Sequence, residues 1–269
     1  MDNPEKNEKT EKKPKEALFT LKNLVFASLL AALVVFLQIV GGIPAGPFNI
    51  TLTLVPIVVG AILLGWQYGT VLGLIFGLVV SILSVTGRDP GGRMVFQTNP
   101  VMGWTLCLLK GAAAGFFPAI VYRAFSKFQY AKHVLVALSG AFLFVSGFAV
   151  SKLVSPEKAW QTALLVIFAA LLSAGYMLLI YRAFQSGKAA VYLAAMVSPI
   201  ANTGIFVLGM ALFYRELLAT WANGTNVALF VIGGLVGVNF IIEFSVAVLL
   251  SPAVARIVET LKKQKSKES

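Results

Sequence analysis

A succession of apolar stretches, most of them close to 20 residues long, constrains this chain more than any other feature. A helix that crosses a lipid bilayer needs ~20 predominantly apolar residues. The chain as a whole is 58% apolar and has a mean hydropathy of +0.85, which lies outside the range of soluble globular domains. The sequence therefore predicts an all-α integral membrane protein with about eight transmembrane segments.

The predicted spans alternate with short polar loops and cover residues 21–40, 51–64, 70–85, 101–122, 133–151, 160–181, 189–214 and 226–250. Residues 1–16 are polar and of mixed charge, which predicts a disordered tail. The transmembrane domain is expected over 17–251, and 252–269 are expected to form a basic amphipathic tail. Most of the 22 Lys and Arg residues fall on the side of the two tails, so both termini are predicted to be cytoplasmic. The net charge of +11 then reflects these flanks, and no nucleic-acid partner is expected.

Residues 41–65 interrupt this pattern. The segment 41–50 is rich in Gly and Pro, has no charge, and carries Phe48 and Asn49. The apolar run that follows it is too short for a straightforward span. Such a backbone is tolerated at membrane depth only where it is buried in protein or lines a cavity, and a broken segment of this kind is typical of the binding site of a membrane carrier. Phe48 is placed to stack over a ligand.

Two charged residues lie inside predicted spans, Lys110 and Glu243. A charge near the bilayer centre costs ~3 kcal/mol on insertion scales, so each is a candidate functional residue. Asn202 and Asn239 are predicted at a depth similar to that of Lys110. The pattern leaves two interpretations open. Lys110 binds an anionic group with the two asparagines beside it, or Lys110 snorkels or pairs with Glu243 while the asparagines join helices by hydrogen bonds. For Glu243, a structural ion pair explains its position at least as well as a functional role does.

The remaining polar and aromatic candidates are less specific. Trp104 fits an interfacial aromatic residue, although it lies close to the predicted site. Arg88 and Arg93 fit solvated loop charges, with steering of an anion as the alternative. The single cysteine and the single histidine exclude a disulfide framework and a Cys- or His-built metal centre. No cofactor and no metal are therefore expected.

Small residues recur at four-residue spacing on three predicted helices. The first helix carries Ala27 and Ala31, a pattern that permits close approach of another helix. Spacing alone does not decide whether that helix belongs to this chain or to a partner. Two further small faces, which comprise Gly69, Gly73 and Gly77, and Gly111, Ala114 and Gly115, are expected to pack within the bundle.

Several of these segments resemble the substrate-binding (S) components of energy-coupling factor transporters, which take up vitamins in bacteria. The resemblance is carried by NLVFASLLAAL (23–33), FNITLTLVPIVVGAILLGWQYGTVLGLIFG (48–77), NPVMGWTLCLLKGAAAG (99–115) and SPIANTGIFVLGM (198–210). The block 48–77 is the most specific of them. The family has six helices, so the resemblance implies a six-helix bundle with an extra helical hairpin inserted at about 131–186.

The resemblance also implies a function. It predicts a vitamin-binding subunit of an importer in the bacterial cell membrane, with its pocket open to the outside. Spans 101–122, 189–214 and 226–250 and the loop after the first helix would build that pocket. The substrate-binding residues expected on this basis are Phe48, Asn49, Trp104, Lys110, Asn202 and Asn239. The family's Ala-xxx-Ala motif matches Ala27 and Ala31, which would dock on a transmembrane coupling subunit. Two ATPase subunits would supply the energy, since the chain itself has no phosphate-binding loop.

Two other classes of membrane protein are the alternatives to this interpretation. A standalone ion-coupled secondary transporter would need a proton or sodium relay, for which Glu243 is the single intramembrane carboxylate. An integral membrane enzyme would need paired carboxylates, a His pair or an activated Ser, and the predicted spans show none of these. The basic residues Lys110, Arg88 and Arg93 mildly favour a carboxylate substrate such as pantothenate, with riboflavin, folate and other vitamins left open.

Overall fold

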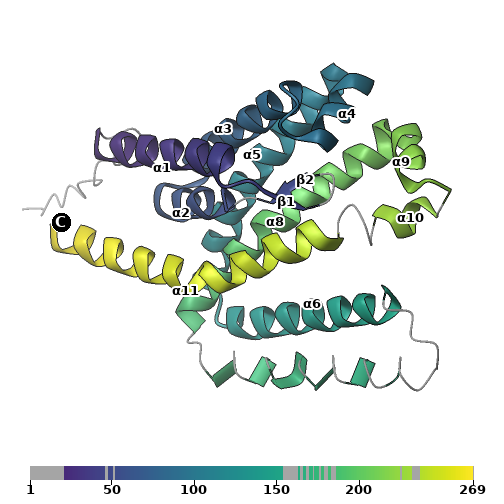
Figure 1. Ribbon diagram of the computed structural model, residues 1–269. Coiled ribbons are helices and arrows are strands. Elements are labelled where there is room, and N and C mark those ends of the chain that lie inside the picture. Colours follow the sequence, from purple (N-terminus) through teal and green to yellow (C-terminus); the bar gives the residue numbers. More distant parts are fainter. Residues whose placement is uncertain are drawn as a thin grey trace, which may run out of the picture.

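The computed structural model describes residues 21–45, 48–50, 52–153, 186–224, 226–231 and 237–268, together with isolated residues between 163 and 182. In chain order the elements are α1 (Leu21–Val40), β1 (Ile43–Ala45), β2 (Phe48–Ile50), α2 (Leu54–Leu64), α3 (Trp66–Val85), α4 (Pro90–Thr98), α5 (Pro100–Phe125), α6 (Ala131–Leu153), α8 (Ser186–Phe213), α9 (Arg215–Ala222), α10 (Val227–Phe230) and α11 (Gly237–Glu268). Figure 1 shows them as one helical assembly.

The predicted membrane bundle is confirmed. Among the described residues, five helices are long and apolar enough to cross a membrane, namely α1, α3, α5, α8 and α11. Shorter apolar helices are α2 and the segment Ala131–Phe142 of α6. Most of the predicted span 160–181 lies outside the described residues. The chain is therefore a multi-pass membrane protein.

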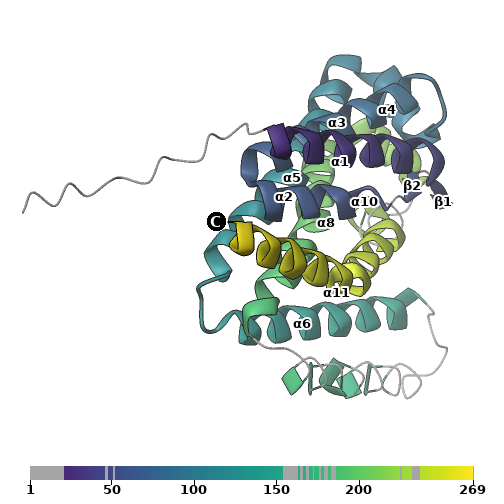
Figure 2. The ribbon, with the colours of Figure 1, turned by 90° about the vertical axis from the view of Figure 1, so that its left-hand side faces the viewer.

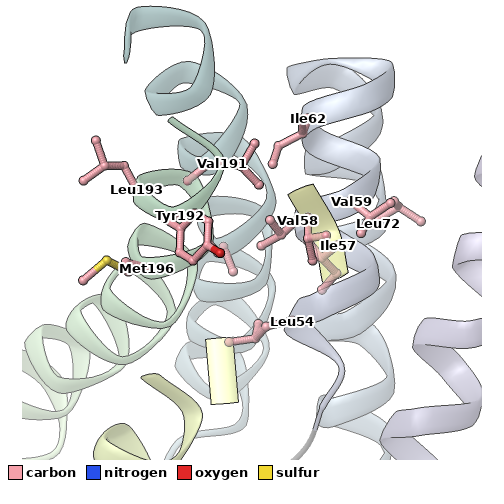
Figure 3. Packing of buried hydrophobic residues seen from close by; sticks show 14 of the residues in the cluster. Leu54, Ile57, Val58, Val59, Ile62, Leu72, Val191, Tyr192, Leu193 and Met196 are labelled. Atoms are coloured by element: carbon pink, nitrogen blue, oxygen red, sulfur yellow. The ribbon is translucent and has the colours of Figure 1, made fainter. Parts of the chain in front are cut away.

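Helix α2 lies at the centre of the apolar core. Its residues Ile57 and Val58 are almost completely buried. Figure 3 shows Val58 on the side of α2 that faces Tyr192 of α8, while Val59 meets Leu72 of α3 on another side. A helix that is apolar all round and buried on several sides belongs in the interior of a bundle, which explains why a segment too short to span the bilayer is stable here.

The closest helix pair is α3 with α5, and glycine makes it possible. A Cβ added at Gly69, Gly73 or Gly77 of α3 would collide with a backbone carbonyl oxygen of α5. The reverse holds for Gly111 and Gly115 of α5, which meet the carbonyl oxygens of Gly73 and Gly69. Small residues at such positions let two backbones touch in a membrane bundle. The predicted packing of these two small faces within the bundle is confirmed.

Side-chain hydrogen bonds tie the helices together at one end of the bundle. Thr53, just before α2, donates to Gln38 Oε1 of α1 at 2.9 Å, and both residues are buried. Tyr214, between α8 and α9, donates to the Asn99 carbonyl oxygen before α5 at 2.9 Å. Burial raises the pKa of Tyr214 to about 12, so the phenol remains a neutral donor to that carbonyl. These bonds fix the end of α1 to the start of α2 and the end of α8 to the start of α5.

The structure differs from the sequence prediction at several element ends. The loop 41–50 contains a two-stranded antiparallel hairpin in which Pro44 pairs with Asn49. The gap of residues 65–69 between two predicted spans is reduced to Gly65, which has a φ of 100°, and α3 begins directly at Trp66. The loops predicted at 86–100 and 215–225 contain the short helices α4 and α9. Both have one apolar face that packs on the bundle, which explains helix formation in segments of polar composition.

The last helix also differs. The described part of the predicted span 226–250 comprises α10 and the first part of α11, and α11 continues through Pro252 to Glu268. The sequence predicts that the last span ends at 250 and that a separate amphipathic tail covers 252–269, whereas one continuous helix runs across this boundary. At this end of the bundle Lys188 of α8 forms an exposed ion pair with Glu259 of α11 at 3.3 Å.

Helix α6, the first half of the expected hairpin insertion, lies at the edge of the bundle. Figures 1 and 2 show it on the far side of α11 from α1 and α2. Its ring of Phe142 stacks on Phe244 of α11 with centroids 3.9 Å apart, and Leu135 is buried against the core. The hairpin boundaries 131–186 and the tail boundaries at 16 and 252 remain predictions.

Candidate functional site

Lys110 lies on α5, ten residues beyond the helix start at Pro100. Asn99 caps that helix by accepting a hydrogen bond from the Met102 backbone N–H at 3.1 Å. The close glycine contact between α3 and α5 fixes the helix against the core. The Lys110 ammonium lies 4.8 Å from the centroid of the Phe206 ring of α8, a cation–π distance. The side chain thus turns from α5 toward α8 and is partly buried.

Asn202 and Glu243 face Lys110 from two other helices. The Asn202 side chain on α8 is 7% exposed and lies near the Glu243 carboxylate of α11. The amide oxygen of Asn202 is buried and has no hydrogen-bond partner. The Lys110 ammonium interacts electrostatically with Glu243 but forms no ion pair with any residue the structure describes. Three helices thus bring a cation, a carboxylate and a free amide acceptor together.

Asp89 is a fourth member of this polar group, and it was not among the residues predicted from sequence. It precedes α4, is 9% exposed, and accepts a hydrogen bond from the Ser84 hydroxyl at 3.3 Å. Burial raises the pKa of the Asp89 carboxyl above its ordinary value, while the nearby Lys110 ammonium acts in the opposite direction. The Asp–Pro pair before α4 was a usable signal, since Asp at the N-cap and Pro at the first position often begin a helix.

A cleft opens beside the polar group. It lies between the start of α2, Ala195 of α8 and the stretch of α11 from Glu243 to Val254. Glu243 is the one charged residue in its lining; the other lining residues are Leu52, Leu54, Val55, Val58, Ala195, Val246, Ala247, Leu250 and Val254. Pockets with apolar walls and a few placed polar groups are the usual form of small-molecule sites.

The other predicted substrate-binding residues are placed as follows. Trp104 lies on α5 two turns before Lys110, and its ring packs edge-to-face on Phe96 of α4 with centroids 5.7 Å apart. Phe48 and Asn49 belong to β2, which lies beside α4 and α11. Asn239 belongs to the first turn of α11. The side chains of Phe48, Asn49 and Asn239 lie outside the described residues, so their expected roles stay predictions.

Ala27 and Ala31, the expected contacts with a coupling subunit, lie on α1. This helix is fixed to the bundle by Leu30, Val34 and Gln38, which are buried along one face. Ala31 is partly buried and packs against the core, and Ala27 is partly exposed one turn earlier. The two alanines therefore lie at the border between the packed face of α1 and its exposed face.

Comparisons with known proteins agree with the resemblance drawn from the sequence. The model of the family described as thiamine transporter protein matches residues 24–156, just under half of the chain. The pantothenic acid transporter PanT of Lactococcus lactis subsp. cremoris (strain MG1363) is 27% identical over 107 residues, which are 37% of this chain and 55% of PanT. The chain thus spans about half the length of the curated relative that it matches.

These findings confirm the resemblance to the S components of vitamin transporters. Taken with the multi-pass helical bundle, these similarities indicate a component of a membrane transporter. The family match includes Asp89, Trp104 and Lys110 and ends before α8. Asn202 and Glu243 therefore lie in a part of the chain that this family match does not cover.

Proposed function

We propose that this protein is the substrate-binding subunit of an importer for a vitamin that carries a carboxylate. The observation that carries the proposal is the Lys110 ammonium in a spanning helix, without an ion-pair partner among the described residues. It lies over the ring of Phe206 on α8, one turn from Asn202, whose amide oxygen has no hydrogen-bond partner. A charge held at such a position is costly and is a functional candidate by default. A substrate carboxylate would supply the missing partner through a charge-assisted hydrogen bond.

The neighbouring groups favour a polar acid over a simple one. The unpartnered Asn202 amide oxygen is available to accept a hydrogen bond from a ligand, and the Glu243 carboxylate is a second acceptor. The site therefore suits a ligand with hydroxyl or amide N–H donors beside its carboxylate. Pantothenate has a carboxylate, an amide and two hydroxyl groups. The similarity to a pantothenic acid transporter supports the same choice.

Thiamine is the second candidate. The family model that matches residues 24–156 is described as a thiamine transporter, and two carboxylates, Asp89 and Glu243, interact with the one lysine of the site. A cationic vitamin would be favoured if these two carboxylates rather than Lys110 made the decisive contacts. The two vitamins carry opposite charges, so binding measurements separate them directly.

Delivery across the membrane is proposed to depend on partners, namely a transmembrane coupling subunit and two ATPases. We expect cells that co-produce this chain with such a module to accumulate radiolabelled pantothenate. Uptake should stop when the phosphate-loop lysine of the ATPases is replaced. Uptake by this chain alone, abolished by a protonophore, would contradict the proposal and support an ion-coupled secondary transporter.

The position of Ala27 predicts that a substitution there affects transport without affecting substrate binding. Ala27→Trp adds a large side chain at the border of the exposed face of α1, so we expect near-complete loss of uptake with an unchanged dissociation constant for the substrate. Leu29→Trp is the matched control, because Leu29 lies on the same helix and is 66% exposed. Equal uptake by the two variants would remove Ala27 from the coupling surface.

A further inference from the structure

The Asp89 carboxylate, in the short connection between α3 and α4, is buried with only part of its hydrogen-bonding capacity used. Its Oδ2 atom accepts the weak hydrogen bond from Ser84, whereas Oδ1 is buried and has no hydrogen-bond partner. The first turn of α4 packs directly on it, since a Cβ at Gly92 would collide with both the Ser84 hydroxyl and Asp89 Oδ2. Burying a carboxylate without full hydrogen bonding costs free energy unless a cation compensates.

The cation that acts on Asp89 is Lys110. The two neighbouring arginines of the same loop, Arg88 and Arg93, are exposed to the surroundings. Cys107, one turn before Lys110 on α5, interacts electrostatically with both Asp89 and Lys110. The carboxylate and the ammonium therefore approach the same face of α5. Lys110 thus interacts electrostatically with two carboxylates, Asp89 before α4 and Glu243 on α11.

We propose that Asp89 is the internal counter-ion of Lys110 and thereby a specificity-determining residue of the site. This inference rests on the proposed function, in which Lys110 receives a substrate carboxylate. In the empty protein Asp89 compensates part of the charge of Lys110. A bound acid takes over that role and is repelled by Asp89, so its carboxylate alone contributes little net affinity. Only acids that also form hydrogen bonds with Asn202 and Glu243 bind tightly. Simple carboxylates lack these bonds and are rejected by the repulsion from Asp89.

The binding test uses the purified full-length chain with pantothenate and its uncharged alcohol analogue, pantothenol. We expect Asp89→Asn to lower the dissociation constant of pantothenate about tenfold, the scale of charge coupling in a partly buried site. The dissociation constant of pantothenol should stay the same. Glu216→Gln, which removes an exposed acid of α9, is the control for net charge and should change neither. An equal change for both ligands, or weaker binding of pantothenate alone, overturns the proposal.

A second test needs no ligand. The melting temperatures of the wild-type protein, Asp89→Asn, Lys110→Met and the double variant form a thermodynamic cycle. We expect Asp89→Asn to be more stabilising in the Lys110→Met protein, where the carboxylate has lost its cation, by about 2–4 °C. Additive effects overturn the counter-ion assignment. If the wild-type protein binds neither pantothenate nor pantothenol, the proposed substrate fails, while this cycle still decides the pairing.

Discussion

Replacing Gly73 by leucine is expected to prevent stable folding. A Cβ at this position already overlaps the carbonyl group of Gly111, and backbone cannot move aside as a flexible side chain can. Overpacking of a core costs about 1–3 kcal/mol and occasionally more. We expect a cost at or above the upper end of this range, because α3 and α5 would have to separate along their whole glycine contact. The measurement is the yield of monodisperse protein in detergent and its melting temperature.

Gly204→Leu is the matched control for that substitution. Gly204 also lies in a spanning helix, α8, but nothing lies within 4 Å of the Cβ position. Helix propensity favours leucine over glycine in both places, so the two variants differ in packing and not in propensity. A Gly73→Leu protein as stable as Gly204→Leu would show that the glycine contact between α3 and α5 does not hold the bundle together.

The second large effect is expected at the site. Lys110→Met keeps the length and apolar stem of the side chain and removes the charge. A hydrogen bond to a charged group contributes about 1.5–3 kcal/mol, so the dissociation constant for an acidic vitamin should rise roughly 10- to 150-fold. Isothermal titration calorimetry on the purified variant measures this change, and Lys110→Arg should recover part of the affinity.

Lys127→Met serves as the control, since Lys127 is exposed beyond the other end of α5. It removes the same charge from the protein without touching the site and should bind as the wild type does. Wild-type affinity in the Lys110→Met protein would remove the lysine from the binding site and leave it a structural partner of Glu243.

The spanning helices were readable from the sequence because their signal is long and purely apolar. The predicted first span, 21–40, coincides with α1. Helices α4 and α9 were missed for the opposite reason. They have nine and eight residues with a mixed composition, and their stability comes from tertiary packing that local propensity does not reveal. The hairpin of β1 and β2 was likewise hidden in a segment dominated by Gly and Pro.

The site was readable in part. Lys110, Asn202 and Glu243 stood out because polar groups inside apolar spans are rare, and the structure brings these three together. Asp89 did not stand out, since a carboxylate in a loop with two arginines is ordinarily solvated. Its burial depends on how α4 folds back over Ser84. That arrangement is a long-range property of the bundle.

The most direct test of the central claim is competitive binding of pantothenate and thiamine to the purified protein. Both vitamins are titrated into the wild-type chain and into Lys110→Met. A binding subunit for an acidic vitamin predicts tight binding of pantothenate that is lost with the lysine charge, and no displacement by thiamine. Tight binding of thiamine that survives in Lys110→Met, with none of pantothenate, would contradict the assignment of Lys110 as the anion-binding group.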